Sequence, residues 1–155
     1  MWRVAFLIFT LDQLSKWLVV HVMDLARVGA IDVLPPFVNF RMAWNYGINF
    51  GLFSSGEGAA RWVLISLALF VVALVLFWMR KEDGRWVRVS AGLLIGGAFG
   101  NVVDRVVYGA VADFLNMSCC GIRNPFSFNL ADIAIFIGAV GLIFLTNDGP
   151  KKKST

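Results

Sequence analysis

The stretch WVLISLALFVVALVLFWM, from Trp62 to Met79, decides the fold class, because it has no charged residue between Arg61 and Arg80. At ~1.5 Å per residue, a helix of this length crosses roughly 30 Å of hydrocarbon with little tilt. The whole chain is similarly apolar, with 59% hydrophobic and 15% charged residues, which is unlike a soluble domain. The sequence therefore predicts an integral membrane protein.

Three further apolar runs lie on either side of this stretch, at about residues 1–21, 86–107 and 126–145. The first run resembles a signal peptide, but Asp12 and Lys16 interrupt it and no small-residue cleavage pattern follows. We therefore predict an all-α membrane protein with four transmembrane helices, about 1–21, 62–79, 86–107 and 126–145, in a single domain of residues 1–155.

Lysine and arginine residues predict the orientation, because short basic loops stay in the cytoplasm. They gather in the connection RKEDGRWVR at residues 80–88 and in the tail at residues 151–153. Both termini are therefore expected in the cytoplasm, with residues 22–60 and 108–125 on the outer side. The net charge of +4 is mostly this topology signal, so it does not indicate nucleic acid binding.

The outer segment at about residues 22–60 contains the one clear strand pattern. After Pro35 and Pro36, apolar side chains alternate with other types in the run FVNFRMAWNYG. This period of two predicts a half-buried strand, followed by a turn at Asn45 to Gly47. We expect a small extracytoplasmic β cradle at the level of the lipid headgroups.

Three carboxylates lie in or beside the apolar runs, in GNVVDRVVYGAVADF at residues 100–114 and FNLADIAIF at residues 128–136. A charge at membrane depth is costly unless it is paired or faces water, so such residues are functional candidates. In the predicted topology, Asp104 lies within about a turn of the outer end of the third helix, and Asp113 lies in the segment just beyond it. Asp132 lies near the outer start of the fourth, so the three carboxylates meet on one side.

Asp113 and Asp132 form the candidate pair, since Gly109, Gly121 and Pro125 allow the chain between them to fold back. Two adjacent carboxylates cannot both ionise easily, and sharing one proton leaves one as base and the other as acid. That is aspartic protease chemistry, which needs no metal or cofactor. From the residues alone, a proton or ion pathway remains the alternative.

Other residues around the pair have structural and functional interpretations. Gly96, Gly97 and Gly100 predict close approach of a neighbouring helix, and the amides Asn101 and Asn129 are expected near the pair. Asp12 and Lys16, four residues apart, form either a structural ion pair or a substrate-facing group. Asp104 and Arg105 point to different helix faces, so each is expected to meet another partner and to lock the bundle.

Four strings occur in order along the chain: DQLSK at 12–16, NYGINFGLF at 45–53, GGAFGNVVDRVVYGAVADF at 96–114 and FNLADIAIF at 128–136. Together they resemble the bacterial lipoprotein signal peptidase family, also called signal peptidase II. The resemblance covers essentially the whole chain. The last two strings carry it most specifically, through Gly-Asn-x-x-Asp-Arg, Gly-x-Val-x-Asp-Phe and Phe-Asn-x-Ala-Asp.

The resemblance implies an intramembrane aspartyl endopeptidase of the bacterial inner membrane, which cleaves prolipoproteins before the diacylglyceryl-modified cysteine and is inhibited by globomycin. It places the catalytic dyad on Asp113 and Asp132, with no metal and no cofactor. The positions that it implies as supporting or lining the site are Asp12, Lys16, Asn45, Gly47, Asn101, Asp104, Arg105, Asn129 and Ala131.

The chain departs from the family at Ile48 and Asn49, where the family usually has two alanines, and this change affects the local fit of substrate or inhibitor. Cys119 and Cys120 have no functional explanation. Two alternative functions remain open: a small proton or ion transporter, and a non-catalytic subunit of a larger membrane assembly.

Overall fold

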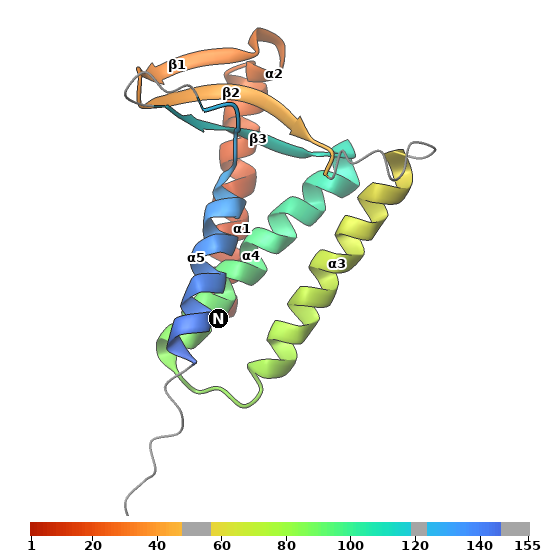
Figure 1. Cartoon of the computed structure of the whole chain (residues 1–155), viewed down its shortest axis with the longest axis vertical. Coiled ribbons are helices and arrows are strands. Elements are labelled where there is room, and N and C mark those ends of the chain that lie inside the picture. Colours follow the sequence, from red (N-terminus) through yellow and green to blue (C-terminus); the bar gives the residue numbers. More distant parts are fainter. Residues whose placement is uncertain (48–56, 119–123, 147–155) are drawn as a thin grey trace, which may run out of the picture.

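The computed structural model describes residues 1–47, 57–118 and 124–146. Ile48, Asn49, Cys119 and Cys120 lie outside these residues. The helices and strands in chain order are α1 (Trp2–Lys16), the π-helical η1 (Trp17–Val22), α2 (Leu25–Val28), β1 (Ala30–Leu34), β2 (Val38–Asn45), α3 (Glu57–Trp78), α4 (Arg85–Tyr108), β3 (Val111–Met117) and α5 (Leu130–Leu145). Four long helices form a bundle, and the sheet lies across one end of it (Figure 1).

Helix α4 lies at the centre of the bundle and packs against α1, α3 and α5. Its glycines allow this, because a Cβ at Gly96 would lie 2.5 Å from the carbonyl oxygen of Ala5 on α1. A Cβ at Gly97 would lie 2.5 Å from the carbonyl oxygen of Ala131 on α5. The prediction that small residues permit close helix approach is confirmed, and it brings α1 and α5 to the same central helix.

Among the described residues, three helical segments are long and apolar enough to cross a membrane: Trp2–Val22, Gly58–Trp78 and Arg85–Tyr108. The last apolar helix, α5, has 16 residues and starts at Leu130, later than the predicted residue 126. The delay arises because Phe128 pairs with Leu115 in an extended conformation before the helix begins. The multi-pass prediction is confirmed, and three of the four predicted spans have full length.

The three strands form one antiparallel sheet in the order β1-β2-β3. Strand β2 confirms the strand predicted from alternation, and it is the central strand. Strands β1 and β2 come from the predicted cradle of about residues 22–60, but two details differ. Helix α3 begins at Glu57, and the third strand comes from Val111–Met117, which the sequence had indicated only as a connection.

The sheet is fixed to the bundle by its third strand. Gly109, with φ of +81°, ends α4 in the left-handed region and turns the chain directly into β3. Phe114 on β3 is then buried against Val19 of η1 and Leu25 of α2. The N-terminus and the connection between α3 and α4 lie at the other end of the bundle (Figure 1).

Candidate active site

Asp113 lies on strand β3 and is 3% exposed. Its carboxylate accepts two hydrogen bonds from side-chain amides. Asn45, at the end of the paired strand β2, donates to Oδ2 at 3.0 Å, and Asn129 donates to Oδ1 at 2.6 Å. Sheet pairing therefore brings Asp113 and Asn45 together, and both partners of the carboxylate are neutral.

Asp132 lies in the first turn of α5 and is partly exposed. The side chain of Asn129 caps this helix by accepting from the Asp132 backbone N–H, and Asp132 Oδ2 accepts from the Asn129 backbone N–H in return. Asp132 Oδ1 also accepts from the amide of Asn101 at 2.9 Å. A reciprocal cap thus fixes the orientation of the carboxylate on the helix.

Asn129 connects the two carboxylates. Its side chain donates to Asp113 and its backbone N–H donates to Asp132. The same side-chain amide also donates to Asn101 Oδ1 at 3.2 Å, and Asn101 in turn donates to Asp132. The predicted pair is therefore brought together, and the predicted amides Asn101 and Asn129 lie beside it.

The environment of Asp113 favours its protonated form. Burial, reinforced by the nearby Asp132 carboxylate, raises the pKa of Asp113 from its ordinary value of 3.8 to about 6. The amides of Asn45 and Asn129 oppose this change but do not cancel it. A carboxyl group that holds its proton in mildly acidic solution is suited to act as an acid.

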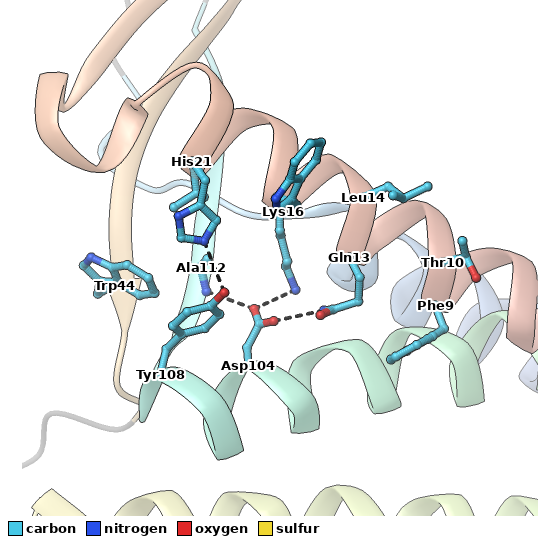
Figure 2. Close-up of a pocket in the computed structure, with 12 residues that line it drawn as sticks. Phe9, Thr10, Gln13, Leu14, Lys16, His21, Trp44, Asp104, Tyr108 and Ala112 are labelled. Atoms are coloured by element: carbon cyan, nitrogen blue, oxygen red, sulfur yellow. Dashed lines mark hydrogen bonds and ion pairs between the residues drawn. The ribbon is translucent and has the colours of Figure 1, made fainter.

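A second group of carboxylates surrounds Lys16 on the neighbouring side of α4. The Lys16 ammonium lies 2.8 Å from Asp12 Oδ2 and 2.8 Å from Asp104 Oδ2. It also donates to Asn101 Oδ1 at 3.3 Å, which links this group to the pair. Figure 2 shows Gln13 and Lys16 reaching from α1 toward Asp104 on α4. We call Asp12, Lys16 and Asp104 the ion cluster.

The ion cluster also holds the backbone immediately before each member of the pair. Asp104 Oδ2 accepts from the N–H of Ala112, which precedes Asp113. Asp12 Oδ1 accepts from the N–H of Ala131, which precedes Asp132. One lysine thus orients two carboxylates, and each of these carboxylates fixes the main chain beside one residue of the pair.

Arg105 lies on a different side of α4 from Asp104, as predicted. It donates to the carbonyl of Asn101, but its Nε atom is buried without a hydrogen-bond partner among the described residues. Arg105 and Asn101 form the polar end of a cavity of about 390 Å³ between α3, α4 and α5. The remaining lining residues are apolar, so the cavity combines a hydrophobic wall with one cationic end.

The other predicted residues take less direct positions. Gly47 has φ of +96° and donates its N–H to Asn45 Oδ1, so it shapes the predicted turn and touches neither carboxylate. Ala131 acts through its backbone. Asp12 and Lys16 form an ion pair with each other, which was one of the two interpretations of these residues.

Sequence reasoning missed Gln13 and Ala112. Gln13 donates to both Asp12 and Asp104, and its place in DQLSK beside Asp12 is the only signal for it. Ala112 contributes only its main-chain N–H, so its residue type carries no signal. Within residues 1–47, 57–118 and 124–146, no three His, Cys, Asp or Glu side chains gather as a metal site would require.

Solved structures support the fold. The chain is similar to a "Bacterial membrane enzyme structure by the in meso method at 1.9 A resolution", with a TM-score of 0.79, 25% identity, and coverage of 95% of this chain and 92% of that one. A second structure, of the same description at 2.3 Å resolution, gives a TM-score of 0.76 at 26% identity over 98% of this chain and 91% of the other.

Sequence relatives carry a more specific description. The "Lipoprotein signal peptidase" of Methylorubrum extorquens is 41% identical over 133 residues, which cover 86% of this chain and 77% of the relative. That of Rhodopseudomonas palustris is 42% identical over 139 residues, covering 86% and 83%. A family model described as "Signal peptidase (SPase) II" matches residues 4–147. The chain therefore belongs to the signal peptidase II family.

Proposed function

We propose that this chain, as one domain of residues 1–155, is an aspartyl endopeptidase that removes signal peptides from prolipoproteins. Membership of the signal peptidase II family supports signal peptide removal. The observation that carries the aspartic mechanism is the connection of Asp113 and Asp132 through Asn129. Cleavage before the diacylglyceryl-modified cysteine follows from the resemblance of the site strings to the family.

In this mechanism Asp113 is the acid and Asp132 is the base. The raised pKa of Asp113, about 6, favours its protonated form, so its O–H donates to the carbonyl oxygen of the scissile bond. Asp132 is more exposed and lies in the first turn of α5, where its two oxygens accept from the Asn101 amide and the Asn129 backbone N–H. Its carboxylate takes a proton from water as that water attacks the carbonyl carbon.

The apolar cavity between α3, α4 and α5 is the proposed binding groove for the signal peptide. Its lining is apolar along its length, which suits a hydrophobic peptide, and Asn101 lies at its polar end beside Asp132. Arg105 enters the same end with a buried Nε that lacks a partner among the described residues. We assign Arg105 to binding a backbone carbonyl of the substrate near the scissile bond.

The proposed topology has four membrane crossings and both termini in the cytoplasm. Helix α5 is short for a span, ~24 Å at 1.5 Å per residue, and the extended residues before it complete the crossing. The basic connection between α3 and α4 lies at the end away from the sheet, which the positive-inside rule assigns to the cytoplasm. The pair then lies near the outer face of the bacterial inner membrane.

Two alternatives are kept as outcomes of the test. A proton or ion transporter would use the carboxylates as a relay, and a non-catalytic assembly subunit would use only the fold. Neither explains why Asp113 and Asp132 are oriented by neutral amides at the end of an apolar groove.

The test is cleavage of a diacylglyceryl-modified prolipoprotein by the purified full chain, followed as a shift on a gel. We expect the native protein to release the signal peptide, globomycin to block release, and Asp113→Asn and Asp132→Asn to be inactive. Full activity in either variant would refute the aspartic mechanism. An inactive native protein that gives Asp-dependent proton flux in liposomes, or that copurifies with one stoichiometric partner, would favour an alternative.

A further inference from the structure

Two neighbouring cavities lie along the groove between α1 and α4. The first, about 370 Å³, lies at the sheet end (Figure 2). The second, about 410 Å³, extends toward the N-terminus of α1 and is lined by Trp2, Ala5, Phe6, Phe9, Ile95, Gly96, Phe99 and Val103. Phe9 lines both cavities, so they are adjacent along the pair of helices, and we call the two together the furrow.

This furrow is separate from the proposed peptide groove. The peptide groove is lined by α3, α4 and α5, whereas α1, α4 and the sheet line the furrow. No residue among those lining the furrow lines the peptide groove as well. The furrow therefore opens toward the surroundings of α1 and α4, which for two membrane-spanning helices means lipid.

Polarity changes along the furrow in the way that it changes along a phospholipid. The cavity toward the N-terminus of α1 is lined only by apolar side chains and glycine. In the cavity at the sheet end, the polar side chains of Gln13, Lys16 and Asp104 line one side, next to aromatic residues. The apolar part fits an acyl chain, and the polar part lies where a headgroup would be at a membrane surface.

The charges at the polar end favour a cationic headgroup. Lys16 is neutralised by two carboxylates, so the ion cluster of two carboxylates and one ammonium carries a net charge of −1. The Tyr108 ring lies 5.6 Å from the Trp44 ring and 6.1 Å from the His21 ring. Aromatic faces next to the negatively charged ion cluster attract an ammonium group. The same negative charge would repel an anionic headgroup.

We propose that this furrow is a binding site for a phospholipid with a primary ammonium headgroup, of the phosphatidylethanolamine class. The ammonium lies against the Trp44 and Tyr108 rings on the side of the ion cluster, and one acyl chain passes Phe9 into the apolar cavity. Since Asp104 also holds the backbone N–H of Ala112, the headgroup lies beside the ion cluster that fixes the strand carrying Asp113.

The test measures bound lipid and does not depend on peptidase activity. The full chain is reconstituted in nanodiscs with equal amounts of palmitoyl-oleoyl phosphatidylethanolamine and phosphatidylglycerol, and native mass spectrometry then identifies the lipid retained after release. We expect a preference of about fivefold for phosphatidylethanolamine, the size of one cation–π contact of ordinary strength. Retention in an enzyme that fails to cleave would leave this site standing while the proposed function fails.

Matched variants locate the site. Val103→Phe fills the apolar cavity and is expected to lower retention of both lipids, whereas Val107→Phe, one turn along α4 at a 63% exposed position outside the furrow, is not. Tyr108→Phe keeps the ring and should keep the preference, whereas Tyr108→Leu should abolish it. Retention insensitive to Val103→Phe would overturn the site, and equal retention or a preference for phosphatidylglycerol would overturn the headgroup assignment.

Discussion

The ion cluster and the Asp113–Asp132 pair are both built from two carboxylates in an apolar bundle, yet their partners differ. In the cluster a lysine lies 2.8 Å from each carboxylate. In the pair every side-chain donor in the described residues is a neutral amide, from Asn45, Asn101 or Asn129. The cluster therefore balances its carboxylates with a cation, whereas the pair has only neutral side-chain donors, which leaves room for a proton on one of its members.

This difference assigns different tasks to the two regions. The cluster is fully partnered and holds the main chain at Ala112 and Ala131. The pair is incompletely neutralised and therefore suited to exchange protons. Changes in the cluster should accordingly affect stability and geometry, and changes in the pair should affect chemistry.

The largest expected effect is on cleavage, from Asp113→Asn or Asp132→Asn. Each removes a general acid or base, so the cleavage rate should fall by about 10⁴-fold. Because the amide is close in shape to the carboxyl and its neighbours are neutral, the thermal unfolding temperature should stay within a few degrees of the native value. A variant that loses both activity and stability would mean that the pair, like the cluster, is structural.

Lys16→Met should produce the opposite pattern. It leaves Asp12 and Asp104 buried at 0% and 1% exposure without their cation, and breaking such a buried pair costs about 3–5 kcal/mol. Thermal unfolding in detergent measures this loss. Arg88→Met is the control, since its ion pair with Asp83 is exposed and should contribute little. Equal unfolding temperatures for the two variants would contradict a structural role for Lys16.

Much of the pair could be predicted, because helix order and depth depend on local sequence. The outward run of α4 and the inward run of α5 bring Asp113 and Asp132 to one end, whatever the detailed packing. Two of the amide partners, Asn101 and Asn129, lie in the same strings as the carboxylates, whereas Asn45 is 68 residues from Asp113 in the sequence. The predicted start of α5 was less accurate, since the Asn129 cap and the pairing of Phe128 with Leu115 set it.

The backbone contacts of the cluster could not be predicted, because they depend on non-local pairing. Strand β3 has no clear alternation of apolar and polar residues, and it forms because β2 offers an edge to which Val111–Met117 can pair. The bond from Ala112 to Asp104 requires that strand. Likewise the bond from Ala131 to Asp12 requires the close packing of α1 and α5 on α4.

Asp104→Leu tests whether the cluster positions the pair. It removes the acceptor for the Ala112 N–H, so the strand beside Asp113 loses its fixed register with α4. A shift of about 1 Å costs roughly 10²-fold in rate, and the loss should be in kcat with KM little changed. Asp104→Asn, which keeps one acceptor oxygen, should recover part of it. Equal losses in both variants would argue against a positioning role.

The smallest expected effect, and the one most specific to Asp113, is the pH dependence of kcat/KM. Burial and the Asp132 carboxylate raise the pKa of Asp113 to about 6, so the acid is lost as the pH rises through 6. We expect kcat/KM to decrease about tenfold per unit above that pH, because it follows the protonation of the free enzyme.

The free energy of unfolding should also depend on pH through Asp113, with the sign expected for a carboxyl group whose pKa is raised in the folded protein. Between the ordinary value of 3.8 and about 6, the folded protein holds a proton that the unfolded chain has released. The contribution of Asp113 to the free energy of unfolding is therefore complete below pH 3.8 and is lost as the pH rises through 6. Asp113→Asn removes this dependence, whereas Asp24→Asn, at an exposed ion pair, should keep it. If the native unfolding temperature does not change between pH 4 and 7 while kcat/KM falls above pH 6, the group that loses its proton is not Asp113. The assignment of Asp113 as the acid of the pair would then be wrong.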